Sequence, residues 1–204
     1  RNATVDDPRV IVALDFPSAD ECLRFVDRLD PRSCRVKIGK QLFTAAGPED
    51  FRMGMRRLAA AVNVITTESE GTRYGMLATA VCSVSAEPPT LLVCVNNSAS
   101  TCEPIARSGR FCVNVLSEKQ QDLARDFLGV DSTKRLDLCD WSRLATGAPA
   151  IDGSLVSFDC EVDQVIASGT HSIFIGRVVV ASLPEADAPL LYFDGAYKGM
   201  TAVA

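Results

Sequence analysis

The residues best suited to binding chemistry lie between positions 74 and 101, in the stretch YGMLATAVCSVSAEPPTLLVCVNNSAST. Gly75 and the small residues 78–80 allow the backbone to approach a flat ring closely. Ser83 to Ser85 alternates hydroxyl groups with an apolar side chain. Hydroxyl and amide groups then gather at the end of the stretch, on Asn96, Ser98, Ser100 and Thr101. Such a cluster suits a phosphate, and the small residues before it suit a planar ring.

A predicted helix follows this cluster. STCE places Ser100 at the N-cap with Glu103 three residues later, and Gly109 stands where the helix should end. A helix start with two hydroxyl groups is a good phosphate site. Two interpretations stay open at this point, because Ser100 could bind a phosphate or could only cap its helix. A flavin, with its flat ring and phosphate tail, would satisfy the whole stretch.

The chain has one histidine, His171, and eight cysteines without a C-x-x-C pair. A single histidine excludes a multi-histidine metal site, and the cysteine spacing suits neither a zinc site nor a disulfide framework. Several cysteines lie in apolar runs, as in TAVCSVS, which is typical of reduced, buried thiols in a cytosolic protein. We therefore expect a cytoplasmic protein without a metal site.

Composition and charge exclude further classes. The 204 residues are 47% hydrophobic and 23% charged, which is ordinary for a soluble folded domain. The formal charge of -5 and the lack of a long Lys/Arg cluster argue against a nucleic-acid partner. The apolar stretch is interrupted by Glu87, Pro88 and Pro89, so we expect no membrane span, and RNATVDDPRV shows no secretory signal.

The elements that must position these residues are mostly strands. Apolar patterning predicts strands at about 62–67, 76–85, 90–96, 111–116, 155–166, 171–183 and 190–193. A basic amphipathic helix is expected from residue 50, in DFRMGMRRLAAA, with others after Ser100 and over 117–129. Many strands with few helices predict a mainly β fold, an antiparallel barrel.

The first 48 residues follow a different pattern. A strand over 8–16, a helix over 18–30 opened by a Ser18/Glu21 capping box, and a strand over 34–39 predict a β-α-β start. A unit this small leaves its sheet faces open and cannot be stable alone.

Six blocks of the sequence, in order, resemble the flavin reductase-like family, the reductase components of two-component flavin monooxygenases. They are FRMGMRRLAAAVNVITT, GMLATAVCSVSAEPPTLLVCVNNSAST, SGRFCVNVL, GAPAIDGSLVSFDCEV, GTHSIFIGRV and PLLYFDGAY. The resemblance covers residues 50–204 and implies an FMN-binding split barrel over 49–204. It also implies a homodimer that passes hydride from NADH or NADPH to FMN or FAD, and a separate monooxygenase that uses the reduced flavin.

The resemblance assigns site residues by position. It implies that the isoalloxazine ring is lined by Met76, Leu77, Ala78, Thr79, Ser83, Val84 and Ser85. It implies that the ribityl phosphate is held by Asn96, Ser98, Ser100 and Thr101, and that Phe127 touches the flavin.

His171, in GTHSIFIGRV, matches the family's histidine beside the nicotinamide and is the candidate catalytic residue. The family often has Asp before it, whereas this chain has Thr170, which removes a possible orienting carboxylate. Tyr197 matches an aromatic residue that closes over the nicotinamide, with a simple barrel plug as its alternative role. Hydride transfer needs little acid-base chemistry, so the protein mainly stacks and orients the reactants.

Residues 8–48 resemble instead the opening of orotidine 5'-phosphate decarboxylase, a TIM-barrel enzyme, in VIVALDF and CRVKIGKQLFTAAGP. By position, Asp15 would be the ribose-contacting aspartate and Lys37 the lysine of the second strand. The chain lacks that family's D-x-K-x-x-D strand, and two of eight barrel strands cannot close. We predict that Asp15 and Lys37 are chemically idle and that residues 1–48 are dispensable for flavin reduction.

Two other functions stay open. The chain could use reduced flavin to reduce another acceptor, such as a corrinoid, or it could bind flavin as a non-catalytic sensor or store. His171 and Tyr197 argue against a sensor. The choices between FMN and FAD and between NADH and NADPH also stay open.

Overall fold

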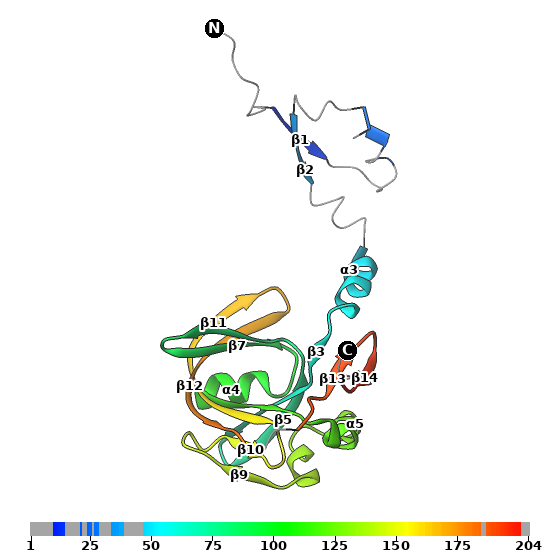
Figure 1. Ribbon diagram of the computed structural model, residues 1–204. Coiled ribbons are helices and arrows are strands. Elements are labelled where there is room, and N and C mark those ends of the chain that lie inside the picture. Colours follow the sequence, from blue (N-terminus) through cyan, green and yellow to red (C-terminus); the bar gives the residue numbers. More distant parts are fainter. Residues whose placement is uncertain are drawn as a thin grey trace. The chain divides into compact units, whose positions relative to one another are not determined.

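The computed structural model describes residues 10–14, 21, 24–25, 27–28, 34–38, 47–184 and 187–200 (Figure 1). The chain separates into two compact units, Arg1–Leu58 and Ala59–Ala204. The division that the sequence suggests at residues 48 and 49 stays a prediction. Asp15, Ser18 and most of the helix predicted over 18–30 lie outside the described residues, as does the side chain of Lys37.

The elements of the first unit whose bounds the structure describes are two strands and a helix. β1 (Val10–Leu14) and β2 (Cys34–Ile38) pair in parallel, with Val10 opposite Cys34, so both predicted strands are confirmed. α3 (Gly47–Arg56) is the basic helix predicted from residue 50. It ends earlier than predicted, because Ala60–Ala61 form the short strand β3 instead.

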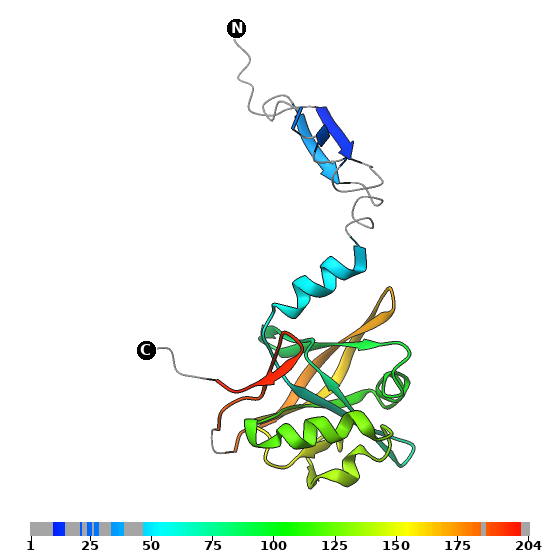
Figure 2. The ribbon, with the colours of Figure 1, turned by 90° about the vertical axis from the view of Figure 1, so that its right-hand side faces the viewer.

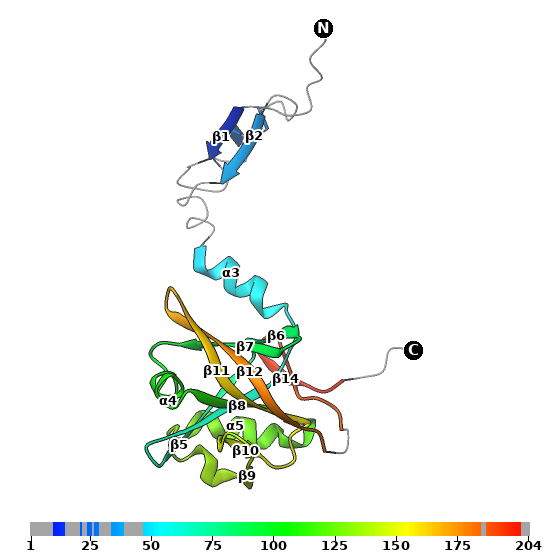
Figure 3. The same ribbon diagram turned by 90° about the vertical axis from the view of Figure 1, so that its left-hand side faces the viewer.

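The second unit is built on one antiparallel sheet of seven strands in the order β5-β4-β8-β11-β12-β7-β6. Their bounds are β4 Asn63–Ser69, β5 Thr72–Ala78, β6 Val81–Ala86, β7 Pro89–Asn96, β8 Arg110–Val115, β11 Val156–Ser168 and β12 His171–Ser182. β11 and β12 form a long hairpin beside β7 (Figure 3). The mainly β prediction is therefore confirmed.

The sheet closes because its two edge strands follow each other in the chain. β5 and β6 stand at opposite edges of the sheet, yet only Thr79 and Ala80 connect them. A flat sheet of seven strands would separate its edges by about 29 Å, whereas the three Cα–Cα steps from Ala78 to Val81 span at most about 11 Å. The sheet must therefore curl until its edges meet at Thr79, which makes the barrel. The prediction of a single strand over 76–85 is wrong. This segment contains the end of β5 and most of β6, which lie at opposite edges of the sheet.

Buried side chains form a cluster on each face of the curled sheet. Strand residues alternate between the faces, so Ile65 enters one cluster with Phe111 and Phe174 while Val64 enters the other. The second cluster contains Phe127 from α5 (Gln121–Gly129), which lies against the sheet (Figure 2). Two small sheets complete the unit, β9 (Trp141–Arg143) with β10 (Pro149–Ile151), and β3 with β13 (Leu191–Phe193) and β14 (Ala196–Lys198).

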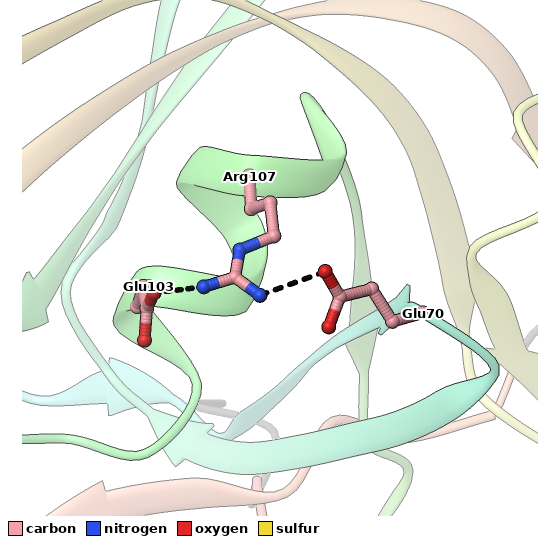
Figure 4. Close-up of polar contacts among 3 residues, drawn as sticks. All are labelled: Glu70, Glu103 and Arg107. Atoms are coloured by element: carbon pink, nitrogen blue, oxygen red, sulfur yellow. Dashed lines mark hydrogen bonds and ion pairs between the residues drawn. The ribbon is translucent and has the colours of Figure 1, made fainter.

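α4 (Cys102–Ser108) packs its buried residues Cys102 and Ile105 into the first cluster. Its outer side is tied to the turn between β4 and β5, where Arg107 Nη1 donates to Glu70 Oε1 over 2.9 Å (Figure 4). Arg107 also bonds Glu103 one turn earlier. The hydrogen bond to Glu70 and then that to Glu103 raise the pKa of Arg107. The helix after Ser100 is thus confirmed, and Gly109 ends it with a left-handed φ of 68°.

Two local predictions need correction. The N-cap of α4 is Thr101 and not Ser100, and its side chain makes no capping hydrogen bond. The expectation of buried thiols fails at Cys82, which is exposed because β6 is an edge strand. The six cysteines whose side chains the structure describes are free, and three of them are buried. Within the described ranges, no helix is long and apolar enough to cross a membrane.

Candidate functional site

A pocket of about 210 Å³ opens where the sheet edges meet. Three predicted ring-binding residues line it from the end of β5, namely Leu77, Ala78 and Thr79. Tyr197 lines it from β14, together with Val62, Leu128 and Tyr192. The structure therefore brings two widely separated parts of the predicted site together around one mostly apolar hollow.

The edge position of β5 gives this pocket free backbone groups. In an antiparallel strand, the N–H and C=O of one residue point to the same side, and residues two apart point alike. The backbone groups of Gly75 point away from β4, since its N–H donates to the carbonyl of Ser132 and its C=O accepts from Arg135. Leu77 therefore presents its N–H and C=O on that same free edge, beside the pocket.

Tyr197 is held in place within the pocket wall. Its hydroxyl donates to the carbonyl oxygen of Ala124 in α5 over 3.3 Å. Its ring meets Tyr192 edge-on, with ring centroids 5.6 Å apart. Partial burial, followed by the neighbouring Tyr192, raises the pKa of the Tyr197 hydroxyl. The hydroxyl is therefore occupied inside the protein, and the ring is the part available to a ligand.

The predicted catalytic histidine lies at the start of β12, paired with the end of β7. His171 is directly opposite Asn96, the first predicted phosphate residue. The next residue, Asn97, donates its N–H to the carbonyl of Thr170 over 2.9 Å and accepts from the Ser172 hydroxyl over 2.8 Å. The residues on both sides of His171 are thereby bound to the loop that follows β7.

Thr170 also contacts the histidine ring. Its Oγ1 lies 2.9 Å from Nδ1 of His171. A group hydrogen-bonded to one ring nitrogen fixes the orientation and tautomer of an imidazole. The structure thus gives His171 a neutral hydrogen-bond partner at the position before it.

The loop after β7 carries the remaining phosphate candidates. Asn96 Oδ1 accepts from the N–H of Ser98 over 2.9 Å and from its hydroxyl over 2.8 Å. The hydroxyl of Ser100 donates to Oγ of Ser132 over 2.7 Å. Thr101 is buried, and its Oγ1 has no hydrogen-bond partner in the described part of the chain. A buried hydroxyl without a partner is costly, so Thr101 Oγ1 has hydrogen-bonding capacity that a ligand or a water would satisfy.

Other predicted residues lie apart from the pocket. Ser83, Val84 and Ser85 run along β6 away from it, with Ser83 opposite Leu91, and the Ser85 hydroxyl bonds the backbone of Glu87. Met76 packs against the cluster inside the barrel. Phe127 is fully buried and lies under Gly75, where an added Cβ would come within 3.2 Å of its ring.

Sequence reasoning missed Ser132 and Arg135. They follow α5 in DSTKR, where Asp131 Oδ1 accepts from the N–H and hydroxyl of Thr133 and so forms a local turn. The Asp-Ser-Thr sequence could have predicted this local turn. Its contacts with Gly75 and Ser100 join positions far apart in the chain, which no local pattern could predict.

Comparisons with known proteins identify the relatives of this chain. Residues 55–201 match the model of the flavin reductase like domain, and residues 8–66 match that of the orotidine 5'-phosphate decarboxylase / HUMPS family. The chain is 44% identical over 155 residues to a protein of Stutzerimonas stutzeri (strain A1501) named FMN reductase (NADH) RutF, covering 76% of this chain and 89% of that one.

Solved structures give the same result. NADH:FAD oxidoreductase SgcE6 of Streptomyces globisporus C-1027, in complex with NAD and FAD fragments, aligns with a TM-score of 0.69 at 29% identity, covering 75% of this chain and 92% of that one. The styrene monooxygenase flavin reductase of Pseudomonas putida S12 aligns with a TM-score of 0.67 at 30% identity, covering 76% of this chain and 99% of that one.

Proposed function

The chain belongs to the flavin reductase-like family, and from this we propose that it is an NADH-dependent flavin reductase whose flavin is FMN. The observation that carries the proposal is the pocket between the free edge of β5 and Tyr197, which combines apolar side chains with backbone donors and acceptors. A flat ring with polar edges needs both kinds of contact.

Two features of the structure fit a flavin. The pocket of about 210 Å³ is smaller than typical ligand pockets of about 300–1,000 Å³, so it suits one ring system better than a whole dinucleotide. The buried, unpartnered Oγ1 of Thr101 fits a phosphate, which offers several acceptor oxygens. We assign Leu77, Ala78 and Thr79 to the ring and Ser100 and Thr101 to the phosphate.

The bound flavin would supply the acceptor for a hydride from the nicotinamide, at N5 of its ring. The residues of this chain bind and orient the two reactants. Leu77 offers its N–H and C=O to the ring edge, and the Tyr197 ring covers the pocket from β14. This arrangement converts an encounter of two free molecules into a reaction between oriented neighbours.

We assign His171 to orientation of the nicotinamide. It stands opposite Asn96 at the end of β7, and Thr170 Oγ1 is 2.9 Å from its Nδ1. With Nδ1 engaged, Nε2 is the ring nitrogen that is left for a substrate. Because no proton has to move with the hydride, His171 contributes by hydrogen bonding and contact rather than as an acid or base.

We further propose a separate monooxygenase as the consumer of the reduced flavin, by analogy with the styrene monooxygenase reductase. A homodimer is supported by apolar side chains exposed on the edge strand β6 and on the β11–β12 hairpin, including Val84, Val165 and Ile166. The six free thiols support a reducing, cytoplasmic location.

An anaerobic absorbance titration tests the proposal. The purified chain is titrated with FMN or FAD and then with NADH or NADPH, while the oxidised flavin band is followed. We expect rapid bleaching with NADH and FMN, and turnover when FMN is in excess. Binding without bleaching would support a flavin sensor or store instead. Absence of flavin binding would refute the proposal, and FAD or NADPH preference would correct the assigned pair.

A further inference from the structure

Residues 130–135, which follow α5, contact both halves of the proposed flavin site. The N–H of Gly75 donates to the Ser132 carbonyl over 3.1 Å, and Arg135 Nη1 donates to the Gly75 carbonyl over 2.9 Å. On the other side, the Ser100 hydroxyl donates to Ser132 Oγ over 2.7 Å. One short segment therefore holds the ring-side strand and the phosphate-side loop.

The contacts with Gly75 occupy the backbone hydrogen-bonding groups of one residue on the outer edge of β5. Both backbone polar groups of Gly75 are used, whereas Leu77, two residues later, presents its own on the same edge. The segment is braced in this position, because Arg135 Nε donates to the Val130 carbonyl over 3.0 Å. Gly75 is also confined from below, since an added Cβ would lie 3.2 Å from Phe127 Cε1 and 3.7 Å from Arg135 Cβ.

The hydrogen bond between Ser100 and Ser132 uses only one of their two hydroxyl protons. Two hydroxyls that share one hydrogen bond have two protons between them, so one O–H lacks an acceptor whichever residue donates. Ser100 is exposed and Ser132 is only 4% exposed. The next residue, Thr101, adds a buried Oγ1 without a partner in the part of the chain that the structure describes. Three hydroxyl groups thus leave two O–H donors without an acceptor, one in the Ser100–Ser132 pair and one on Thr101. Such donors suit an acceptor-rich group, and a phosphate is one.

We propose that residues 130–135 set the spacing between the ring edge and the phosphate hydroxyls, and that Ser132 is a positioning residue that favours phosphorylated flavins through Ser100. The inference rests on the proposed function and adds to it the selection of FMN over riboflavin, which has the same ring and ribityl chain but no phosphate. Arg135 positions the ring-side strand β5, because it bonds the carbonyl of Gly75.

The test compares FMN with riboflavin, using flavin fluorescence titrations of the full chain. We expect Ser132→Ala to weaken FMN binding about fivefold to tenfold, the effect of one lost hydrogen bond, and to leave riboflavin binding within about twofold. We expect Arg135→Lys, which keeps the charge but loses the forked geometry, to weaken both ligands by a similar factor. Ser154→Ala is the matched control, because Ser154 is also a buried serine but its Oγ, unlike that of Ser132, has no hydrogen-bond partner among the described residues.

Ser100→Ala gives a second measurement at an exposed position. If the two serines act as one unit, the variant with both changes should lose no more FMN affinity than Ser100→Ala alone. An unchanged ratio of FMN to riboflavin affinity in Ser132→Ala would overturn the inference while leaving the reductase function standing. A wild-type chain that binds neither flavin would instead refute the function itself, and the inference with it.

Discussion

The two units of this chain resemble two enzyme families, but among the described residues only the second unit shows a closed sheet. In the first unit, the described strands are the parallel pair β1 and β2. In the second, seven strands curl until β5 and β6 meet, and buried clusters form on both faces. A strand pair needs only local apolar runs, whereas a binding site needs a closed sheet whose edges come together. We therefore expect the chemistry of this chain in the unit whose sheet closes.

The largest expected effect is on the packing inside the barrel. At Gly176, an added Cβ would lie 2.5 Å from Phe111 Cζ and 3.0 Å from Cys160 Cβ. Gly176→Ala should therefore destabilise the second unit by about 1–3 kcal/mol, since a packed core cannot absorb the extra atom. A thermal denaturation curve measures this, with a melting temperature lower by about 2–4 °C for each kcal/mol.

The matched control lies in the first unit. Gly54, in α3, has nothing within 4 Å of an added Cβ. Gly54→Ala should be neutral or stabilising, because alanine favours a helix interior by about 1 kcal/mol. Equal melting temperatures for the two variants would contradict the contrast between a tightly packed barrel and an open helix position.

The next largest effect is expected on catalysis, where a variant of His171 is compared with a variant of Lys37. His171→Ala should lower kcat/KM for NADH about fivefold to tenfold, as expected for one lost substrate contact, and leave the Kd for FMN within about twofold. Lys37→Ala, in β2 of the first unit, should change neither value. Steady-state kinetics and flavin titrations measure both. An equal loss of NADH use and FMN binding in His171→Ala would argue for a structural role of this histidine.

The next prediction concerns the rates at which cysteines are alkylated, which show how well the closed sheet protects its buried thiols. Burial raises the pKa of Cys139 to about 11 and that of Cys160 to about 12, and it raises the pKa of Cys112 as well. The thiolate is the reactive form, so these cysteines should resist alkylation at neutral pH, while the exposed Cys82 reacts first. Mass spectrometry after brief treatment with iodoacetamide identifies the sites. Modification of Cys160 as fast as Cys82 would mean that the barrel opens readily.

The smallest expected effect is that of removing residues 1–48. This truncation retains every strand of the seven-stranded sheet and every residue that lines the pocket. FMN affinity and NADH turnover should stay within about twofold of the full chain, because the truncation removes no residue that we assign to the site. A soluble truncated protein that no longer binds flavin would show that the first unit contributes to the site.

Much of the fold was predictable because its signals are local. The alternating apolar residues of β7, β8, β11 and β12 predicted strands close to their observed bounds, and Gly109 marked the end of α4. The run 76–85 was misread because nothing local distinguishes one strand from two that pair with different neighbours. The short strands β9, β10 and β14 were missed because three residues give too little periodicity.

The candidate site also contains residues that the sequence pointed to and residues that only the structure revealed. Sequence resemblance selected Leu77, Ala78, Thr79 and Tyr197, and the structure brings these four residues to one pocket. Resemblance did not select Ser132 or Arg135, since they act through the backbone of Gly75 and the hydroxyl of Ser100, and a sequence does not display such contacts. It noted Thr170 only as a departure, whereas the structure makes it the partner of His171.

The sequence by itself determined the mainly β fold and the change of pattern after residue 48, because both follow from side-chain type and short-range periodicity, which a chain carries wherever it folds. Its resemblance to the flavin reductase-like family selected the residues that we propose for the ring, phosphate and nicotinamide contacts. Only the tertiary structure decided that Thr79 and Ala80 join the two edges of one sheet, and that Ser132 bonds both Gly75 and Ser100. The physical reason is that strand order and loop contacts depend on which distant groups can bury surface and pair their hydrogen bonds together.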